Sequence, residues 1–460
     1  MTAQAIAASL REPLARLPGP RLRRDETGLL ALVSAALLLG FVTLRTQEAM
    51  AAGHDELTLG DPTVPLVYLG AVWAVHLAFV LTARRSDQVL LPAVALLGGL
   101  GLLLATRLPR SLVLQRFGPV ELGLGELQLL WLVIGLAVIA WLAITVRNDN
   151  WLRLYRYSWA GAGIALLLAV FLFGREVNGA RLTLCVGPVC GQPSELLKVL
   201  LVVFLAGYLS ENRGLLTTQR TRVGPLSLPP LPYLLPMLAM WAIALAVVIV
   251  QRDLGAALLL YSVFLAVLFA ATARWSYVAL GVLLFVVGSL VLYAVFPHVR
   301  TRIDIWLDPF ADPLGAGYQT LRALYAFGRG GILGTGLGAG LPAAGGAPAI
   351  PAVHTDFAFT ALAEETGYLG VAAIIGTYLV VLQRGLRIAA RSADDFRALL
   401  AAGLTLTIGI QTAIIIGGNA RLIPLTGITA PYLSYGGSSI LASALAIGLL
   451  LAFSEHEARR

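Results

Sequence analysis

Long apolar runs alternate with short polar segments along most of the chain. Twelve runs come close to the roughly 20 residues that an α-helix needs to cross a bilayer. They predict an all-α, polytopic membrane protein with about 12 transmembrane helices. Their approximate ranges are 27–45, 65–83, 89–106, 127–146, 157–173, 194–210, 231–250, 254–272, 277–296, 357–382, 398–418 and 436–453.

One pair of runs has an unusually short connection. The runs 231–250 and 254–272 are joined only by Gln251-Arg252-Asp253-Leu254. A tight, charged hairpin of this kind leaves two interpretations open, because the runs are either two full spans or two short, re-entrant helices.

The pattern changes between Phe296 and Phe357, where about sixty residues lack a spanning apolar run. This segment, 297–356, precedes the third-last predicted helix and carries much of the polar chemistry of the chain. Loops of this length are uncommon in compact domains unless they have a function. The segment is therefore the first place to look for a site.

Composition supports the membrane assignment and excludes a soluble globular domain. The chain is 58% hydrophobic and 13% charged, with a mean hydropathy of +0.82. The formal charge of +8 does not indicate nucleic acid, because the basic residues are scattered arginines between apolar runs. Short basic loops of this kind set topology and contact anionic lipid head groups.

The distribution of charge predicts the orientation. With the N-terminus inside, most arginines fall in cytoplasmic segments, whereas segment 46–64 has four acidic residues and no arginine or lysine. Positive-inside bias therefore puts both termini in the cytoplasm and loop 297–356 outside. The expected organisation is a cytoplasmic tail 1–26, additional N-terminal helices and the start of the membrane domain 27–106, the main membrane domain 107–453, and a cytoplasmic tail 454–460.

Two groups of ionisable residues lie where the bilayer should be. In the first, the only lysine, Lys198, follows Glu195 by three residues in an apolar run, so the two side chains can pair on one helical face. Such a pair either orders the helix bundle or holds a cation near an anionic substrate. Both interpretations stay open.

A second, acidic group begins at Asp356 and continues with Glu364 and Glu365 about two helical turns deeper. These are either buried carboxylates satisfied by arginine or backbone, or part of a site.

Cys185 and Cys190 flank a Gly-Pro turn in the predicted outside loop 174–193. A disulfide and two free thiols are equally compatible with that spacing.

A glycine-rich run, 328–338, lacks the Gly-Lys-Ser/Thr ending of a nucleotide-binding loop. It is interpreted as a flexible loop whose backbone approaches a ligand closely. Just before it, residues 318–327 can form a short helix that puts Gln319, Arg322 and Arg329 on one outward-facing edge. Arginine forks suit phosphate or pyrophosphate.

An outward-facing site has no access to cytoplasmic ATP, so a substrate there must bring its own leaving group. A lipid-linked pyrophosphate sugar meets that demand. A carboxylate would then act as general base on an incoming hydroxyl. Asp312 is the best candidate, with Asp304 and Asp308 as competitors, and the alternative is that Asp312 only forms a turn.

Several separated blocks together resemble the SEDS family (shape, elongation, division and sporulation), the RodA/FtsW group of peptidoglycan glycosyltransferases. The blocks are Asn178-Gly179-Ala180-Arg181, Gln192-Pro193-Ser194-Glu195-Leu196-Leu197-Lys198, Gln251-Arg252-Asp253-Leu254-Gly255, Asp312-Pro313-Leu314-Gly315-Ala316-Gly317-Tyr318-Gln319, His354-Thr355-Asp356-Phe357, Glu364-Glu365-Thr366-Gly367, Pro424-Leu425-Thr426-Gly427 and Ser434-Tyr435-Gly436-Gly437-Ser438-Ser439.

The resemblance implies a ten-helix core preceded by two additional N-terminal helices, in a bacterial cell membrane. It implies polymerisation of lipid II into glycan strands, with undecaprenyl pyrophosphate leaving and Asp312 as the catalytic residue. It also implies a class B penicillin-binding protein and other elongation or division complex proteins as partners, without choosing between the two roles. A divalent cation, Mg or Mn, is an open requirement, because the sequence has no compact ligand cluster.

The candidate substrate-binding residues come from these blocks and from loop 297–356. They are Arg181, Glu195, Lys198, Arg302, Gln319, Arg322, His354, Asp356 and Ser434. Two other functions compete with the transferase: a flippase for a lipid-linked cell-wall precursor, and a scaffold that only recruits a transpeptidase.

Overall fold

The structure is a computed structural model. It describes residues 23–51, 61–117, 119–177, 180–187, 189–218, 221–223, 226–228, 251, 253–340 and 349–458, with a few positions between 235 and 249.

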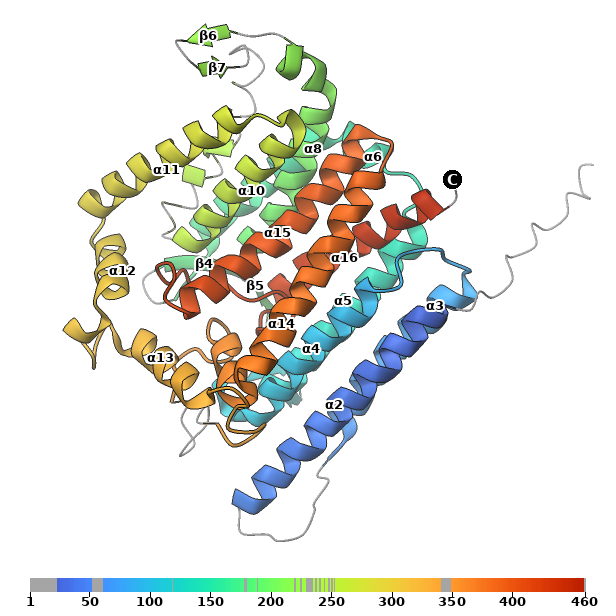
Figure 1. Ribbon diagram of the computed structural model, residues 1–460, viewed down its shortest axis with the longest axis vertical. Coiled ribbons are helices and arrows are strands. Elements are labelled where there is room, and N and C mark those ends of the chain that lie inside the picture. The colour runs from blue at the N-terminus through green and yellow to red at the C-terminus, as the bar shows by residue number, and fades with distance from the viewer. Residues whose placement is uncertain are drawn as a thin grey trace, which may run out of the picture.

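Helices dominate the described chain (Figure 1), and the short strands lie in the connections between them. The helices are α2 (Arg24–Ala51), α3 (Thr63–Leu81), α4 (Leu90–Arg107), η1 (Arg110–Leu112), α5 (Leu124–Thr145), α6 (Asn150–Leu154), α7 (Arg156–Phe173), α8 (Pro193–Thr218), α10 (Leu254–Thr272), α11 (Trp275–Val295), α12 (Pro297–Leu307), η2 (Pro309–Ala311), α13 (Tyr318–Gly330), α14 (Ala358–Arg391), α15 (Asp395–Asn419) and α16 (Gly437–Ala458). The strands are β1 (Gln115–Phe117), β2 (Val120–Leu122), β3 (Arg175–Val177), β4 (Ala180–Val186), β5 (Val189–Gly191), β6 (Thr221–Val223) and β7 (Leu226–Leu228).

Within the described residues, eleven helices are long and apolar enough to cross a membrane. They coincide with eleven of the twelve runs that the hydropathy pattern predicts, so the all-α, multi-pass fold is confirmed. The remaining run, 231–250, lies mostly outside the described residues. Whether 231–272 spans fully or is re-entrant therefore stays open.

The most buried spanning helices are α4, α8, α15 and α16, whose apolar stretches are 72–78% buried. Helices α5, α10 and α14 pack against them (Figure 1). In α16, 78% of the residues in its apolar stretch are buried inside the protein. In α11 only 6% of the residues in the corresponding stretch are buried. The side chains of α11 are therefore left largely uncovered by the rest of the protein. The two N-terminal helices α2 and α3 pack on α4 and α5 at one side of the bundle.

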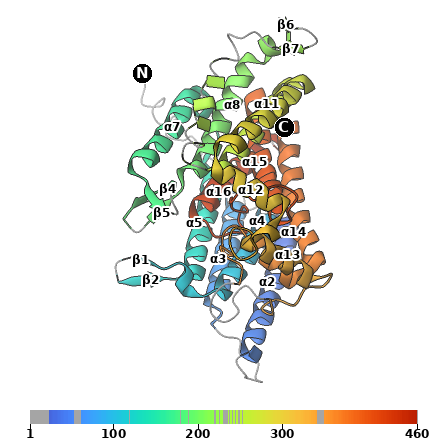
Figure 2. The same ribbon diagram turned by 90° about the vertical axis from the view of Figure 1, so that its left-hand side faces the viewer.

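Short antiparallel hairpins decorate the helix connections (Figure 2). Cys185 in β4 lies directly opposite Cys190 in β5. The two cysteines form a disulfide, which resolves the choice that their spacing leaves open.

Segment 297–356 contains defined structure and is not one irregular loop. It holds α12, η2 and α13, which follow one another along one end of the bundle (Figure 2). The predicted short helix 318–327 is confirmed as α13, and it extends to Gly330.

Helix α14 is broken at Gly367, whose φ is +64°. The glycine-rich run enters this break, where Tyr368 N–H donates to Gly331 O at 2.9 Å and Gly336 N–H donates to Glu365 O at 3.0 Å. These bonds replace helical ones, so the close backbone approach of the run is made to α14. The interpretation of the run as a flexible ligand loop is therefore wrong for residues 331–336.

We expect Gly367→Ala to destabilise the fold. A β-carbon at Gly367 would clash with the backbone nitrogen of Gly334, and the positive φ alone costs about 1–3 kcal/mol for a residue with a side chain. Gly376→Ala in the same helix is the control, because a β-carbon there meets nothing within 4 Å. The melting temperature in detergent should drop for the first variant only; equal melting temperatures would contradict the packing described here.

Candidate functional site

Asp312 lies in the turn between η2 and α13, with its carboxylate exposed to solvent. One oxygen accepts the N–H of Gly315 at 3.0 Å and the other accepts the N–H of Ala316 at 2.8 Å. A β-carbon on Gly315 would clash with the Asp312 carboxylate. Glycine at position 315 is therefore needed to leave room for this carboxylate. The turn-forming contacts expected of a loop aspartate are present.

Next to this turn lies a cavity of about 160 Å³, here called the loop cavity. Five polar side chains line it: Arg302 from α12, Gln319 and Thr320 from α13, Asp356 before α14 and Arg421 after α15. Ala316, whose N–H binds Asp312, lines it too. The cavity thus combines two guanidinium groups with one carboxylate beside the candidate base.

The two arginines of the loop cavity are fixed through backbone carbonyls. Arg302 donates to Thr426 O at 3.2 Å. Arg421 donates to Trp306 O at 2.8 Å, and Trp306 Nε1 donates back to Arg421 O at 3.1 Å. Neither guanidinium has a carboxylate in salt-bridge contact among the described residues. Both retain positive charge for a bound anion.

Burial raises the pKa of Asp356 to about 6. The hydrogen bond from Thr355 and the positive charge of Arg302 oppose that rise, whereas the charge of Asp253 adds to it. Asp356 therefore titrates close to neutral pH, which is the range in which a general acid or base works best.

A second, smaller cavity of about 30 Å³ lies deeper in the bundle and is called the helix cavity. Glu195 and Lys198 line it, with Lys198 Nζ 2.5 Å from Glu195 Oε2 and 2.6 Å from Gln411 Oε1. Asp253, which also lines it, caps α10 by accepting the N–H of Ala256 at 3.0 Å. The predicted pairing of Glu195 with Lys198 is confirmed.

Gly427 lines both cavities and lies where they meet. Burial raises the pKa of Asp253, and the nearby charge of Glu195 raises it further. Arg302 acts on the carboxyl groups of both Asp253 and Asp356. The two cavities therefore share one electrostatic environment.

The glutamates Glu364 and Glu365 of α14 are buried carboxylates that arginines satisfy, which is the first of the two interpretations given for them. Glu364 pairs with Arg329 at 2.8 Å, and Glu365 pairs with Arg107 of α4. The Arg329 side chain is 42% exposed, which is compatible with the outward edge predicted for it, but its guanidinium is already used in the ion pair with α14.

Three of the candidate substrate-binding residues whose side chains are described do not line either cavity, namely Arg322, His354 and Ser434. Arg322 lies over the Tyr318 ring at 4.8 Å, and Ser434 holds a turn by accepting the N–H of Ala430 at 3.0 Å. The carbonyl of His354 accepts the N–H of Tyr435 at 2.7 Å, and burial lowers the pKa of its ring. Arg181 belongs to β4, opposite Glu176, and its side chain lies outside the described atoms.

Asp253 and Arg421 are cavity residues outside the set of sequence-predicted candidates. Asp253 has a signal in the sequence, since a charged Gln-Arg-Asp triplet directly before an apolar run marks a helix start. Arg421 has none, because its place depends on a contact with Trp306 across 115 residues.

No group of three or more His, Cys, Asp or Glu side chains converges anywhere in the described ranges. Magnesium usually keeps several waters and takes one or two protein carboxylates together with substrate phosphates. The Mg or Mn requirement therefore stays a prediction.

A family model described as "Cell cycle protein", which groups FtsW, RodA and SpoVE, matches residues 87–459. The chain belongs to this family. The match begins between α3 and α4, so the two N-terminal helices precede the FtsW/RodA/SpoVE region, as the sequence blocks imply.

Relatives of both named groups are similar to this family member. Peptidoglycan glycosyltransferase RodA of Mycobacterium tuberculosis is 40% identical over 459 residues, which cover 99% of this chain and 95% of the relative. The probable peptidoglycan glycosyltransferase FtsW of Thiomicrospira cyclica is 35% identical over a match that covers 68% of this chain and 78% of the relative.

The fold is also similar to a solved structure described as "Structural coordination of polymerization and crosslinking by a peptidoglycan synthase complex". The TM-score is 0.62 at 28% identity, with 82% of this chain and 99% of that chain covered. The fold described here therefore corresponds to nearly the whole of that solved chain.

Proposed function

We propose that this protein is a peptidoglycan glycosyltransferase that polymerises lipid II at the outer face of the bacterial cell membrane. The observation that carries the proposal is the 40% identity, over 99% of the chain, to enzymes named peptidoglycan glycosyltransferase RodA. The loop cavity supports it, because two arginines without carboxylate partners among the described residues suit a diphosphate.

In the proposed mechanism, Arg302 and Arg421 bind the diphosphate of the lipid-linked donor. Asp312 accepts the proton of the incoming sugar hydroxyl, whose oxygen forms the new bond to the donor sugar. The bond between that sugar and the diphosphate breaks, and undecaprenyl diphosphate leaves with the electron pair. Its negative charge increases as the bond breaks, so the arginines stabilise the transition state more than the ground state.

Orientation and partners are part of the same proposal. Both termini are cytoplasmic and segment 297–356 is outside, in agreement with the positive-inside rule and with the disulfide between Cys185 and Cys190.

A class B penicillin-binding protein is the proposed partner, because a similar fold occurs in a synthase complex that couples polymerization to crosslinking. Other proteins of the elongation or division complex would join this pair.

Purified protein, reconstituted with its transpeptidase partner, should convert labelled lipid II into glycan strands that separate on a gel. If the protein were a flippase, lipid II would instead cross vesicle membranes without strand formation. Transport without polymerisation would overturn the proposal in favour of that second function.

The pKa of Asp356 predicts how diphosphate binding depends on pH. Below about pH 6 the neutral Asp356 no longer offsets the charges of Arg302 and Arg421. Burial keeps the His354 ring neutral to lower pH than usual, whereas the terminal phosphate of the ligand titrates at about pH 6 as Asp356 does. The contribution of Asp356 is therefore measured as a difference from Asp356→Asn: at about pH 7.5 the variant should bind undecaprenyl diphosphate on the order of fivefold more tightly than wild type, because one nearby negative charge is missing.

The difference between wild type and Asp356→Asn should disappear at about pH 5.5, where Asp356 of the wild type is neutral. Fluorescence titration with labelled undecaprenyl diphosphate measures both. The same pH profile in wild type and Asp356→Asn would mean that another group controls binding.

A further inference from the structure

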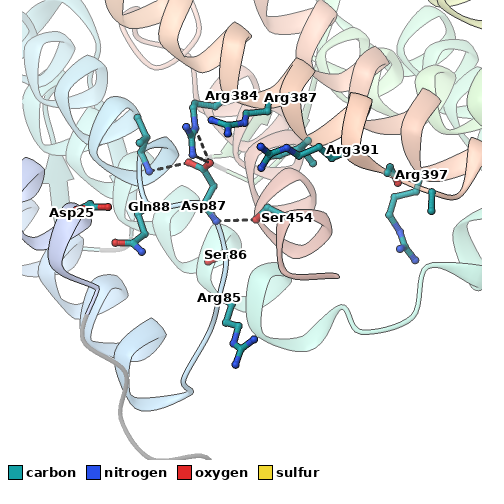
Figure 3. A pocket seen from close by; sticks show the side chains of 14 residues that line it. Asp25, Arg85, Ser86, Asp87, Gln88, Arg384, Arg387, Arg391, Arg397 and Ser454 are labelled. Carbon is teal, nitrogen blue, oxygen red and sulfur yellow. Dashed lines mark hydrogen bonds and ion pairs between the residues drawn. The ribbon is translucent and has the colours of Figure 1, made fainter. Parts of the chain in front are cut away.

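A third cavity, here called the arginine cavity, lies at the end of the bundle opposite the loop cavity and has a volume of about 680 Å³. The connection from α3 to α4, the end of α14, the start of α15 and the end of α16 surround it (Figure 3). Five arginines line it, against two aspartates. The arginines are Arg85, Arg384, Arg387, Arg391 and Arg397.

Two of these arginines already have carboxylate partners. Arg384 binds Asp87 through Nε at 2.7 Å, and Arg397 binds Asp149 at 2.8 Å. Asp87 also accepts the N–H of Val89 at 2.9 Å. Asp87 and Asp149 are therefore used in holding the α3–α4 connection against α14 and in fixing the start of α15. Asp25, the other aspartate of the lining, is exposed and offsets only part of the basic charge.

Arg387 and Arg391 differ from the other cavity arginines. Both are exposed, and within the described part of the chain neither makes a hydrogen bond or an ion pair. Together with Arg384 they occupy positions i, i+3 and i+7 of α14, so the three guanidinium groups follow one face of the helix. Figure 3 shows them in sequence along the last turns of α14 above the α3–α4 connection.

A hydroxyl group adds to this basic row. Ser392, which directly follows the last residue of α14, lines the arginine cavity. Its side-chain oxygen is buried and has no hydrogen-bond partner among the described residues. A buried hydroxyl usually has a partner, so the cavity lacks an acceptor that a bound ligand would supply.

We propose that the arginine cavity binds the phosphate headgroup of an anionic membrane lipid. Arg387 and Arg391 would hold the phosphate oxygens through charge-assisted hydrogen bonds, and Ser392 would donate a third. The cavity lies at the helix ends, where headgroups of the adjacent leaflet reach the protein. The acyl chains would then run along the exposed apolar side chains of the bundle, such as Leu386.

A lipid suits this place better than the N-terminal segment of the same chain. Residues 1–22 contain Arg11, Arg16 and Arg21 and a single acid, Glu12. A basic segment does not complement a basic cavity. The cytoplasmic leaflet, by contrast, carries anionic lipids that attract arginines near the surface, at about 1 kcal/mol per residue. Assignment to that leaflet rests on the orientation in the proposed function.

The test compares lipid affinity of the full-length protein in native mass spectrometry, titrated with phosphatidylglycerol or with zwitterionic phosphatidylcholine. We expect Arg387→Gln/Arg391→Gln to weaken phosphatidylglycerol binding about tenfold or more, as expected for two phosphate contacts, and to leave phosphatidylcholine binding unchanged. The matched control is Arg24→Gln/Arg153→Gln, which removes the same charge at the same end of the bundle from residues outside the cavity. It should change phosphatidylglycerol affinity less than about twofold.

Equal losses in the two double variants would overturn the proposal, because they would indicate diffuse surface charge. Displacement of phosphatidylglycerol by glycerol phosphate at a similar concentration would overturn it in favour of a soluble phosphate ligand. Failure of this proposal can be distinguished from failure of the transferase proposal. Asp312→Asn should lose polymerisation but still bind phosphatidylglycerol like wild type. An unchanged melting temperature of both double variants would exclude unfolding as the cause.

Discussion

Asp312→Asn should reduce lipid II polymerisation by a factor of about 10² to 10⁴, which is the usual contribution of a general base. Asparagine has nearly the same shape, and its oxygen can still accept a hydrogen bond from Gly315 or Ala316. The turn should therefore persist while the proton acceptor is lost. Single-turnover strand synthesis from labelled lipid II, with the transpeptidase partner present, measures the effect.

Asp308→Asn is the matched control for this experiment. Asp308 lies four residues earlier, is exposed and also holds a turn, because its carboxylate accepts the N–H of Phe310 at 3.0 Å. It does not line the loop cavity. Polymerisation by Asp308→Asn should stay within a few-fold of wild type.

Two outcomes would contradict the role of Asp312. Full activity of Asp312→Asn would leave this aspartate with only its turn-forming contacts. Loss of activity in Asp356→Asn, with Asp312→Asn active, would transfer the role of base to the aspartate inside the loop cavity, whose pKa of about 6 also suits proton transfer.

The spanning helices could be predicted from sequence because each depends on a local property. An apolar run of sufficient length is stable in a bilayer only as a helix, so the runs 127–146 and 436–453 predict the helices found at Leu124–Thr145 and Gly437–Glu455. The Glu195–Lys198 pair is predictable for the same reason, since three residues of helix bring the side chains together.

The glycine-rich run shows where local sequence patterns are insufficient. Its composition is compatible with a flexible loop, but its conformation is determined by a break in α14 about thirty residues later. Hydrogen bonds from Thr335 to Glu364 O and from Gly336 to Glu365 O fix it there. No pattern within residues 328–338 contains that information.

Residues of the loop cavity show the same limit. Arg302 and Asp356 could be selected as polar residues of one long segment. Arg421 could not, because it lies after another membrane helix and reaches the cavity through its contact with Trp306. Long-range pairing of this kind follows from the packing of the whole bundle, which the order of residues alone does not give.

Lys198→Met should destabilise the protein strongly. Lys198 is 3% exposed, and its ammonium group donates to Glu195 and Gln411 within the bundle. Methionine fills a similar volume but leaves the carboxylate of Glu195 without a cation. Breaking a buried ion pair from one side costs about 3–5 kcal/mol. Thermal unfolding in detergent, or the free energy of unfolding from denaturant titration, should record this loss.

Glu195→Gln/Lys198→Met is the informative companion variant. It removes both charges, and the amide introduced in place of the Glu195 carboxylate could bond Gln411, so we expect most of the lost stability to return. A double variant no more stable than Lys198→Met alone would contradict the pairwise account. If the double variant folds and still polymerises lipid II, the pair only orders the bundle. If it folds but is inactive, the charged pair is required for catalysis or substrate binding, since the stability of the bundle no longer depends on it.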